Sequence, residues 1–323
     1  MGGALAAPLA RARKPTEPRT IGFLSPHPPL PPEHPVARAV LAVYQRHGWT
    51  LGETLRIERP NAEGREERLR ALAEELVRKR VEVIWALGPE AAIAAARATR
   101  TIPIVFWGVA WPIEQGPIES FARPGRSATG IAFTAGSEGE KVLETMREIA
   151  PKAVRLAQIA TPSALRTVGG DLFQGTLPSL QVAAKRLGFE MRRIEIARVE
   201  DIEGAFAAVR ESRAQALYVP GTTLTFRERG RFVDFANQNG LPSGFNQFEF
   251  VDAGGPFSYG IGSMQTILQT FEYVDRILRG AKPAELPVQL PQRFQPVLNR
   301  KTALALGLAL PQSLLVRADR AIE

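Results

Sequence analysis

The residues of this 323-residue chain that could do chemistry are mostly small, hydroxyl-bearing or aromatic, and they follow short apolar segments. Such residues suit the holding of a small molecule. Backbone N–H groups can bind a carboxylate, hydroxyls can orient it, and aromatic faces supply contact area. The candidate binding residues are Ser25, His27, Gly88, Pro89, Trp107, Gly108, Ala110, Trp111, Phe133, Thr134, Thr161, Pro162, Ser163, Gly221, Thr222, Thr223, Asn246, Gln247 and Tyr259. For Tyr259, packing is as good an explanation as ligand contact. For His27, a position in a solvated loop is as good an explanation as a contact in the binding cleft.

Motifs for catalysis are missing from the sequence. The prolines of SPHPPLPP, which follow the first predicted strand, lack the N–H donors that cradle a pyrophosphate, and neither GxxxxGK[ST] nor GxSxG occurs. His27, His34 and His47 lack the spacing of a zinc site, and the chain has no cysteine. Glu249 and Asp252 lie close in sequence, but a solvated turn accounts for them. We therefore expect no catalytic residue, no metal and no cofactor.

Alternating apolar strands and amphipathic helices position these residues. The first strands are expected at Thr20–Ser25, Leu55–Arg59, Val81–Leu87 and Ile102–Trp107, with helices between them. This βαβ alternation predicts a parallel sheet with right-handed crossovers. The alternation restarts at Gly130–Phe133, so we expect an α/β protein with two doubly wound lobes and a hinge at the Pro/Gly-rich segment Ala122–Gly130. Ligands of such sheets bind beyond the carboxyl ends of the strands, where the candidate residues lie.

The four tryptophans separate into two groups. Trp85 lies inside an apolar strand, which predicts a core position, and Trp49 follows a helix-ending glycine, which predicts a structural role. Trp107 and Trp111 flank Gly-Val-Ala just after a strand. Packing between lobes is the simpler explanation for this pair, but the loop position favours a cleft contact for at least one of them.

The net charge of +8 allows two interpretations. A basic protein could bind nucleic acid or an anionic membrane. The charges instead alternate in sign along segments such as Gly64–Arg80, which is typical of solvated helix faces, and no dense basic run occurs. We therefore expect no nucleic-acid partner.

The N-terminus indicates export. Met1–Ala12 resembles the tail of a secretory signal peptide, with a cleavage-like site near Leu9–Arg13. A disordered cytosolic tail is the alternative. No apolar run reaches the ~18 residues that a membrane span needs.

The order of several segments resembles the substrate-binding proteins of ABC importers, in the family that includes tryptophan- and tyrosine-binding lipoproteins. The matching segments are IGFLS, EGREERLRALAEELVRKRVEVIWA, PEAAIAAARATRTIPIVF, FARPGRSATGIA, FVDAGG with FSYG, and KTALALGLALPQSLLVRAD. The resemblance implies the type I periplasmic binding fold, in which two Rossmann-like lobes joined by a three-segment hinge close on a ligand like a flytrap. It also implies a periplasmic or otherwise extracytoplasmic monomer that is not an enzyme and that delivers a small molecule to an ABC permease.

By this resemblance, residues 1–18 are the remnant of a signal peptide and a linker. Residues 19–129 and 261–283 form the first lobe, and residues 130–260 and 284–323 form the second. The helix near Ser263–Gly280 then returns to the first lobe.

Two departures from the family pattern bear on the ligand. Trp111-Pro112 stands where relatives often have Asp-Pro, and Gly221–Thr223 stands where amino-acid binders place an acidic residue. A desolvated ammonium normally needs a carboxylate partner. The sequence therefore favours an aromatic or apolar carboxylate as ligand, with an aromatic amino acid second. A cytosolic ligand-sensing module and an enzyme on a doubly wound sheet are the competing functions.

Overall fold

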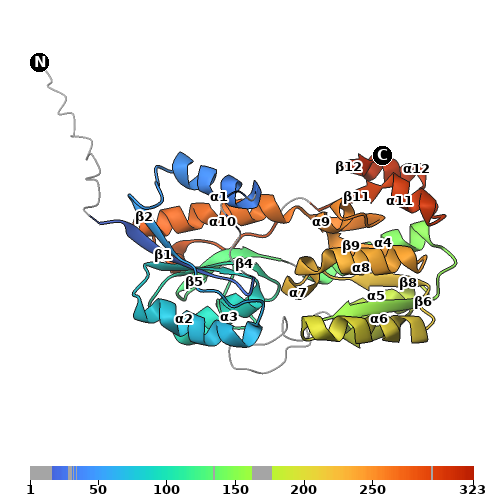
Figure 1. Cartoon of the computed structure of the whole chain (residues 1–323), viewed down its shortest axis with the longest axis horizontal. Coiled ribbons are helices and arrows are strands. Elements are labelled where there is room, and N and C mark those ends of the chain that lie inside the picture. Colours follow the sequence, from blue (N-terminus) through green and yellow to red (C-terminus); the bar gives the residue numbers. More distant parts are fainter. Residues whose placement is uncertain are drawn as a thin grey trace, which may run out of the picture.

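The computed structural model describes residues 17–27, 31, 33, 35–133, 135–161, 177–291 and 294–323. These residues form two α/β lobes that lie side by side along the long axis of the molecule, each built on its own sheet (Figure 1). The predicted fold class is confirmed. None of the described helices is both long enough and apolar enough to cross a membrane.

The first lobe holds a parallel sheet with the strand order β2-β1-β3-β4-β5. Its strands are β1 (Arg19–Leu24), β2 (Leu55–Glu58), β3 (Val83–Leu87), β4 (Ile104–Val109) and β5 (Ala128–Ala132). The helical segments between them are α1 (Pro35–Arg46), η1 (Glu66–Arg68), α2 (Leu69–Arg78) and α3 (Pro89–Ala98). In α2 the buried residues Leu69, Ala73 and Leu76 recur at helical spacing, so one face enters the core while the charged face meets solvent.

The second lobe repeats this order and extends it to β12-β11-β10-β9-β8-β6-β7. Its strands are β6 (Arg155–Ala160), β7 (Glu190–Glu195), β8 (Ala216–Val219), β9 (Ser243–Gln247), β10 (Phe257–Ile261), β11 (Gln295–Asn299) and β12 (Arg320–Ile322). Its helical segments include α5 (Leu177–Arg186), η3 (Val199–Asp201), α6 (Ile202–Glu211), α7 (Thr223–Arg227), α8 (Arg229–Gln238), α9 (Glu249–Asp252), α11 (Arg300–Ala305) and α12 (Gln312–Arg317). Strand β11 pairs antiparallel with β10.

Two helices each follow a strand of one sheet but pack on the sheet of the other lobe. Helix α4 (Ala135–Ile149) follows β5 of the first sheet but packs on β8, β9 and β10, and α10 (Ser263–Leu278) follows β10 of the second sheet but packs on β3, β4 and β5. In Figure 1 the orange helix α10 lies in the same lobe as the blue to green strands β1–β5. Helix α10 thus lies against the sheet of the first lobe, where the helix near Ser263–Gly280 was expected.

Three tryptophans of the first lobe donate their indole N–H groups to α10. Trp49 Nε1 lies 2.7 Å from Asp275 Oδ1, Trp85 Nε1 lies 2.8 Å from Thr270 Oγ1, and Trp107 Nε1 lies 3.0 Å from Thr266 Oγ1. Trp85 is 1% exposed and Trp49 is 8% exposed, which confirms their predicted core and structural positions. These bonds fix the helix along the face of the first sheet.

The crossings between the lobes lie a few residues away from their predicted places. Strand β5, residues 130–132 included, belongs to the first sheet, so the first crossing follows Ala132 rather than lying at residues 122–130. The second crossing is at Gly262, between β10 and α10. The residues of η4 (Pro283–Glu285) and those that follow it up to Gln289 still belong to the first lobe. Gln289 exchanges backbone hydrogen bonds with Gly130 and Ala132 of β5. The last crossing therefore precedes β11.

The prediction of a hinge at Ala122–Gly130 was wrong. Gly130 lies within strand β5 and is needed for its pairing with β4. A Cβ at this position would clash with the carbonyl oxygen of Phe106 in the neighbouring strand β4. The glycine thus permits close pairing of β5 with β4. Glycine content alone does not distinguish this close approach from a flexible joint.

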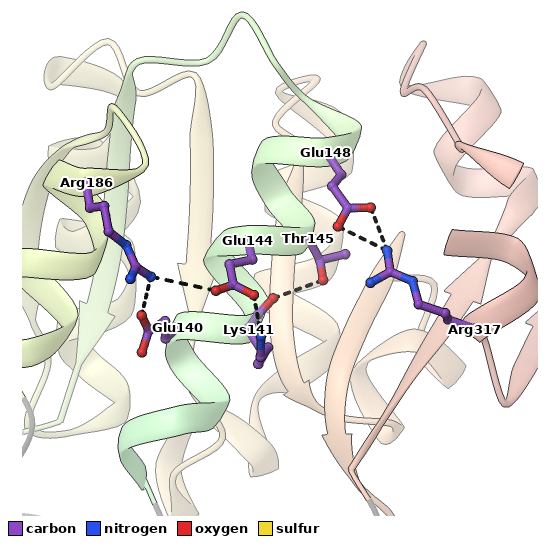
Figure 2. A network of polar contacts seen from close by, with 7 residues as sticks. All are labelled: Glu140, Lys141, Glu144, Thr145, Glu148, Arg186 and Arg317. Atoms are coloured by element: carbon purple, nitrogen blue, oxygen red, sulfur yellow. Dashed lines mark hydrogen bonds and ion pairs between the residues drawn. The ribbon is translucent and has the colours of Figure 1, made fainter. Parts of the chain in front are cut away.

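The exposed face of α4 is joined to its neighbours by ion pairs (Figure 2). Arg186 of α5 pairs with Glu140 and Glu144, Lys141 Nζ lies 2.6 Å from Glu144 Oε2, and Arg317 Nη2 of α12 lies 2.8 Å from Glu148 Oε2. The pairs connect helices on both sides of α4. This arrangement supports the interpretation that much of the chain's charge is distributed over solvated helix faces.

Candidate ligand-binding site

The strand order reverses once in each lobe, between β1 and β3 in the first and between β6 and β8 in the second. Adjacent crossovers leave the sheet in opposite directions at such a point and open a crevice at the carboxyl ends of the strands. The predicted residues Ser25, Gly88, Thr161 and Thr222 all follow these four strands. These predicted residues therefore lie at the two points where the strand order reverses.

The two crevices meet at Glu90 and Thr223. Thr223 Oγ1, at the start of α7 in the second lobe, donates to Glu90 Oε2 in the first turn of α3, at 3.0 Å. Gly88, the residue before α3, has a φ of 88°, and a Cβ there would lie 2.7 Å from Thr223 Oγ1. Pro89 occupies the first helical position, where its missing N–H costs nothing. The lobes thus approach to hydrogen-bonding distance at the switch points.

Hydroxyl and amide groups on the second lobe form a connected polar surface. Thr161 and Thr222 have their Oγ1 atoms 3.0 Å apart, and Thr222 also caps α7. The backbone N–H of Gly221 donates to Asn246 Oδ1 at 2.6 Å, and Asn246 Nδ2 donates to Glu138 Oε2 at 3.4 Å. Each group therefore holds a fixed orientation at the carboxyl ends of β6, β8 and β9.

On the first lobe, Ser25 and His27 form the turn after β1. Ser25 is buried, and its Oγ accepts the backbone N–H of His27 at 3.1 Å. Burial lowers the pKa of His27, the cations Arg227 and Arg229 on the second lobe lower it as well, and Glu228 opposes them, so that the pKa is about 4. His27 is therefore a neutral imidazole near the lobe boundary at pH 7.

Three of the predicted aromatic residues lie at the ends of β4 and β5. Trp107 is inside β4, so its predicted loop position was wrong, whereas Trp111 follows β4 and Phe133 follows β5. Trp107 and Phe133 pack edge to face with ring centroids 5.0 Å apart, and Gly108, with a φ of 84°, lies beside Phe133. Ala110 and Trp111 follow and are half-buried. Because Trp107 donates its N–H to α10, it contributes to the packing of the first lobe as well as to the aromatic contact with Phe133.

Two further predicted residues come from β9 and β10. Gln247 is 5% exposed, its side chain packs on Gly221, and its Oε1 has no hydrogen-bond partner among the described residues. Tyr259 lies opposite Pro296 in the sheet and packs against the core beneath α4. The structure thus favours the packing explanation for Tyr259. Gln247 is the last residue of β9 and lies beside Gly221, among the other candidate residues of the second lobe.

A cavity of about 820 Å³ opens between the lobes beside the contact of Glu90 with Thr223. Its walls come from the turn after β1, from η1, α2 and α3 on one lobe, and from η3 and α7 on the other. This volume lies within the range of about 300–1,000 Å³ that is typical of small-molecule sites. The cavity includes His27 and Thr223 among the predicted residues.

Two buried acids at this edge, Glu90 and Glu138, were not among the predicted binding residues, although Glu90 ends the candidate loop after the third strand. Burial raises the pKa of Glu90 to about 8, with a smaller contribution from the charge of Glu66. Burial also raises the pKa of Glu138 to about 8, against an opposing hydrogen bond from Asn246. Both acids occupy the first turn of a helix that follows a strand, and that position was the signal that could have identified them.

Some predictions fall outside the described residues. These are Thr134, Pro162, Ser163 and His34, together with nearly all of the expected leader in residues 1–18. Within the described ranges, no group of three or more His, Asp or Glu side chains lies together in a way that could hold a metal ion.

Comparison with known proteins agrees with this geometry. A family model described as "ABC transporter substrate binding protein" matches residues 39–322. The tyrosine-binding protein of Clostridioides difficile is 23% identical over 280 residues, which cover 85% of this chain and 79% of that protein.

Two solved structures have similar folds. An ABC domain from Streptococcus pneumoniae in complex with L-Trp has a TM-score of 0.80 and 20% identity, and covers 95% of this chain and 100% of that one. A solute-binding protein of an ABC transporter from R. palustris in complex with benzoate has a TM-score of 0.53 and 17% identity, and covers 83% of this chain and 76% of that one. The matching family consists of solute-binding proteins rather than enzymes. The chain belongs to the ABC transporter substrate-binding proteins, and its two lobes have the type I periplasmic binding fold.

Proposed function

We propose that this protein is the extracytoplasmic receptor of an ABC importer and that it binds a small aromatic solute between its lobes. The observation that carries the proposal is the hydrogen bond from Thr223 to Glu90, because it joins the ligand-binding edges of two separate sheets. A ligand bound there contacts both lobes at once. Permease subunits would then recognise the closed monomer.

Closure follows from the connections between the lobes. A ligand that binds one lobe and gains further contacts on the other stabilises the closed state by its differential affinity. The three crossings lie at the ends of strands and helices, where a few residues can absorb the change in backbone dihedral angles. The polar surface around Thr161, Thr222 and Asn246 stays fixed on the second lobe during this motion.

The ligand class is an aromatic compound with a carboxylate. The named ligands of the relatives, tyrosine, L-Trp and benzoate, share these two features. In this chain the hydroxyls of Thr161 and Thr222 on the second lobe can orient a carboxylate. Trp107 and Phe133 supply aromatic surface on the first lobe. Export to the periplasm or cell surface is the location that such a role requires.

A ligand panel tests this proposal. Purified protein would be screened for thermal stabilisation by tryptophan, tyrosine, phenylalanine, benzoate and 3-(4-hydroxyphenyl)propionate, with glucose and adenosine as controls. A ligand that binds only the folded state at 100 times its Kd stabilises that state by about 2.7 kcal/mol, so Tm rises. Stabilisation by glucose or adenosine with no response to any aromatic compound would refute the aromatic class.

A further inference from the structure

Helix α7 contacts the first lobe at both of its ends. Its first residue, Thr223, bonds to Glu90 at the start of α3. Its last residue, Arg227, lies against Gly64, in the turn before η1, where a Cβ would clash with Nη1 of Arg227 and lie 3.2 Å from its Cζ. Residues four apart share one face of a helix, so α7 presents the same face to the first lobe at both contacts.

The turn that carries Gly64 is held in place on the first lobe. The backbone N–H of Gly64 donates to the carbonyl oxygen of Pro26, after β1, at 2.9 Å. Asn61 Oδ1 accepts the backbone N–H of Glu63 at 2.7 Å. Glu63 and Gly64 have φ values of 55° and 76°, in the left-handed region. The second lobe therefore docks on a backbone surface that these bonds have already shaped.

The guanidinium of Arg227 is held from its own lobe. Its Nε lies 2.9 Å from Glu228 Oε1, so the ion pair fixes the plane of the group while Nη1 faces Gly64. Burial, and after it the charge of Arg227, lowers the pKa of His27 on the first lobe. Gly64 and His27 thus place the same cation at the lobe boundary. Gly64 and Arg227 also both line the cavity between the lobes.

We propose that the contact of Arg227 with Gly64 is a closure contact that stabilises the ligand-bound state without either residue touching the ligand. This inference rests on the proposed function and adds a contact at the far end of α7 from Thr223. Opening of the lobes separates Arg227 from Gly64 but leaves its ion pair with Glu228 intact. The stabilisation is therefore present in the closed state alone, and it raises the affinity for any ligand that requires that state.

Glycine is the residue that this contact requires at position 64. A methyl group there would occupy the place of the guanidinium. Because an arginine side chain is flexible, the methyl would displace it rather than prevent the lobes from approaching. Gly64→Ala and removal of the guanidinium should therefore abolish the same contact and have the same effect on binding.

A double-mutant cycle tests this expectation. Gly64→Ala and Arg227→Met would be made alone and together, and isothermal titration calorimetry would give the Kd for L-tyrosine and for benzoate. Each single variant should raise the Kd by about threefold or more, and the double variant should raise it no further than the weaker-binding single variant. Effects that multiply in the double variant would show that the two residues act separately and would overturn the inference.

Two control variants separate closure from local damage. Gly48→Ala has the same backbone strain, with a φ of 81°, but nothing lies within 4 Å of the new methyl. Arg231→Met removes a second arginine from Glu228, one that also binds Glu203 within the second lobe. Both controls should leave the Kd within about twofold of wild type, because neither changes a contact between the lobes.

The distance between the lobes is a second measurement. The chain has no cysteine, so Ala71→Cys on α2 and Gly204→Cys on α6, both at exposed positions, direct two spin labels to opposite lobes. Pulsed electron paramagnetic resonance would compare the ligand-free and ligand-saturated protein. Gly64→Ala and Arg227→Met should shift the distances towards the open form, whereas Gly48→Ala and Arg231→Met should not.

The outcomes separate this inference from the proposed function. If neither probe nor any other aromatic compound of the panel binds the wild-type protein, the proposed function fails. The spin-label distances of the ligand-free protein then decide on the closure contact, and identical distributions in wild type and both variants would overturn it. If the probes bind but Gly64→Ala and Arg227→Met behave like their controls, the function stands and the closure contact is wrong.

Discussion

The indole N–H of Trp85 donates to the hydroxyl of Thr270 at 2.8 Å, although 185 residues separate them in the chain. Trp85 lies in the middle of β3, and Thr270 lies in the middle of α10. The bond joins the first half of the chain to the helix that returns from the second lobe. With the bonds of Trp49 to Asp275 and Trp107 to Thr266, it sets the position of α10 on the sheet.

Replacing Thr270 by valine should destabilise the first lobe. Thr270 is fully buried, so the variant leaves the indole N–H of Trp85 without an acceptor. The expected loss in the free energy of unfolding is about 1–3 kcal/mol. Urea denaturation of the ligand-free protein measures it. Thr270→Ser keeps the hydroxyl and should retain most of the stability, and equal losses in both variants would argue against the hydrogen bond as the cause.

Two glycine-to-alanine changes should have opposite effects. Gly130→Ala places a methyl group against the carbonyl oxygen of Phe106 and should prevent close pairing of β5 with β4, giving insoluble or strongly destabilised protein. Gly204→Ala lies on an exposed part of α6 with open space around the new methyl, and should stabilise the protein by about 0.5–1 kcal/mol. Soluble yield and denaturant midpoints report both effects. A well-folded Gly130→Ala protein would contradict the close-approach explanation.

Loss of the hydroxyl of Thr223 should weaken ligand binding without lowering the stability of either lobe. The bond to Glu90 forms only when the lobes approach, so Thr223→Val removes stabilisation from the closed state alone. A hydrogen bond to a neutral carboxyl group is worth about 0.5–1.5 kcal/mol, which corresponds to a rise in Kd of about two- to ten-fold. Calorimetric titration with the best ligand of the panel measures it. Thr223→Ser should bind nearly as tightly as wild type.

The stability of the ligand-free protein should fall as pH rises from about 6.5 to 8. Glu90 and Glu138, each with a pKa of about 8, keep a proton in the folded state that the unfolded chain has already lost, and the slope approaches about 1.4 kcal/mol per pH unit for each group. His27 acts in the opposite direction below its unfolded pKa. It protonates in the unfolded chain but stays neutral when folded, so its own contribution to stability is lost as pH falls from about 6.5 towards 4. Above about pH 4.5 this loss offsets about half of the gain from the two acids.

Denaturation at a series of pH values checks this profile. Glu138→Gln should reduce the slope between pH 6.5 and 8 by about one proton equivalent, while His27→Asn should leave that range unchanged. Stability that rises over the same range would show that the two acids are ionised in the folded protein.

The sequence was sufficient for features that depend on local pattern. Apolar strands followed by small or hydroxyl residues identified Ser25, Gly88, Thr161 and Thr222, because parallel strands bring their carboxyl ends to one edge. Features that depend on distant partners were missed. Glu90 reads as an ordinary helix residue until Thr223, 133 positions later, is placed against it. Gly130 reads as a hinge until β4 is placed beside it, and the pairing of β11 with β10 has no local signature.

The position of α10 has a consequence for biosynthesis. The first lobe cannot complete the cover on the face of its sheet that holds Trp85 until Leu278 has been translated, although α1 covers part of it earlier. At about 5–20 residues per second, β5 is complete on the order of ten seconds or more before that helix exists. The usual order, in which an N-terminal domain folds while the rest of the chain is still being made, is therefore unavailable to this lobe. The core of the first lobe can therefore be completed only after α10 has been made, when most of the chain has been translated.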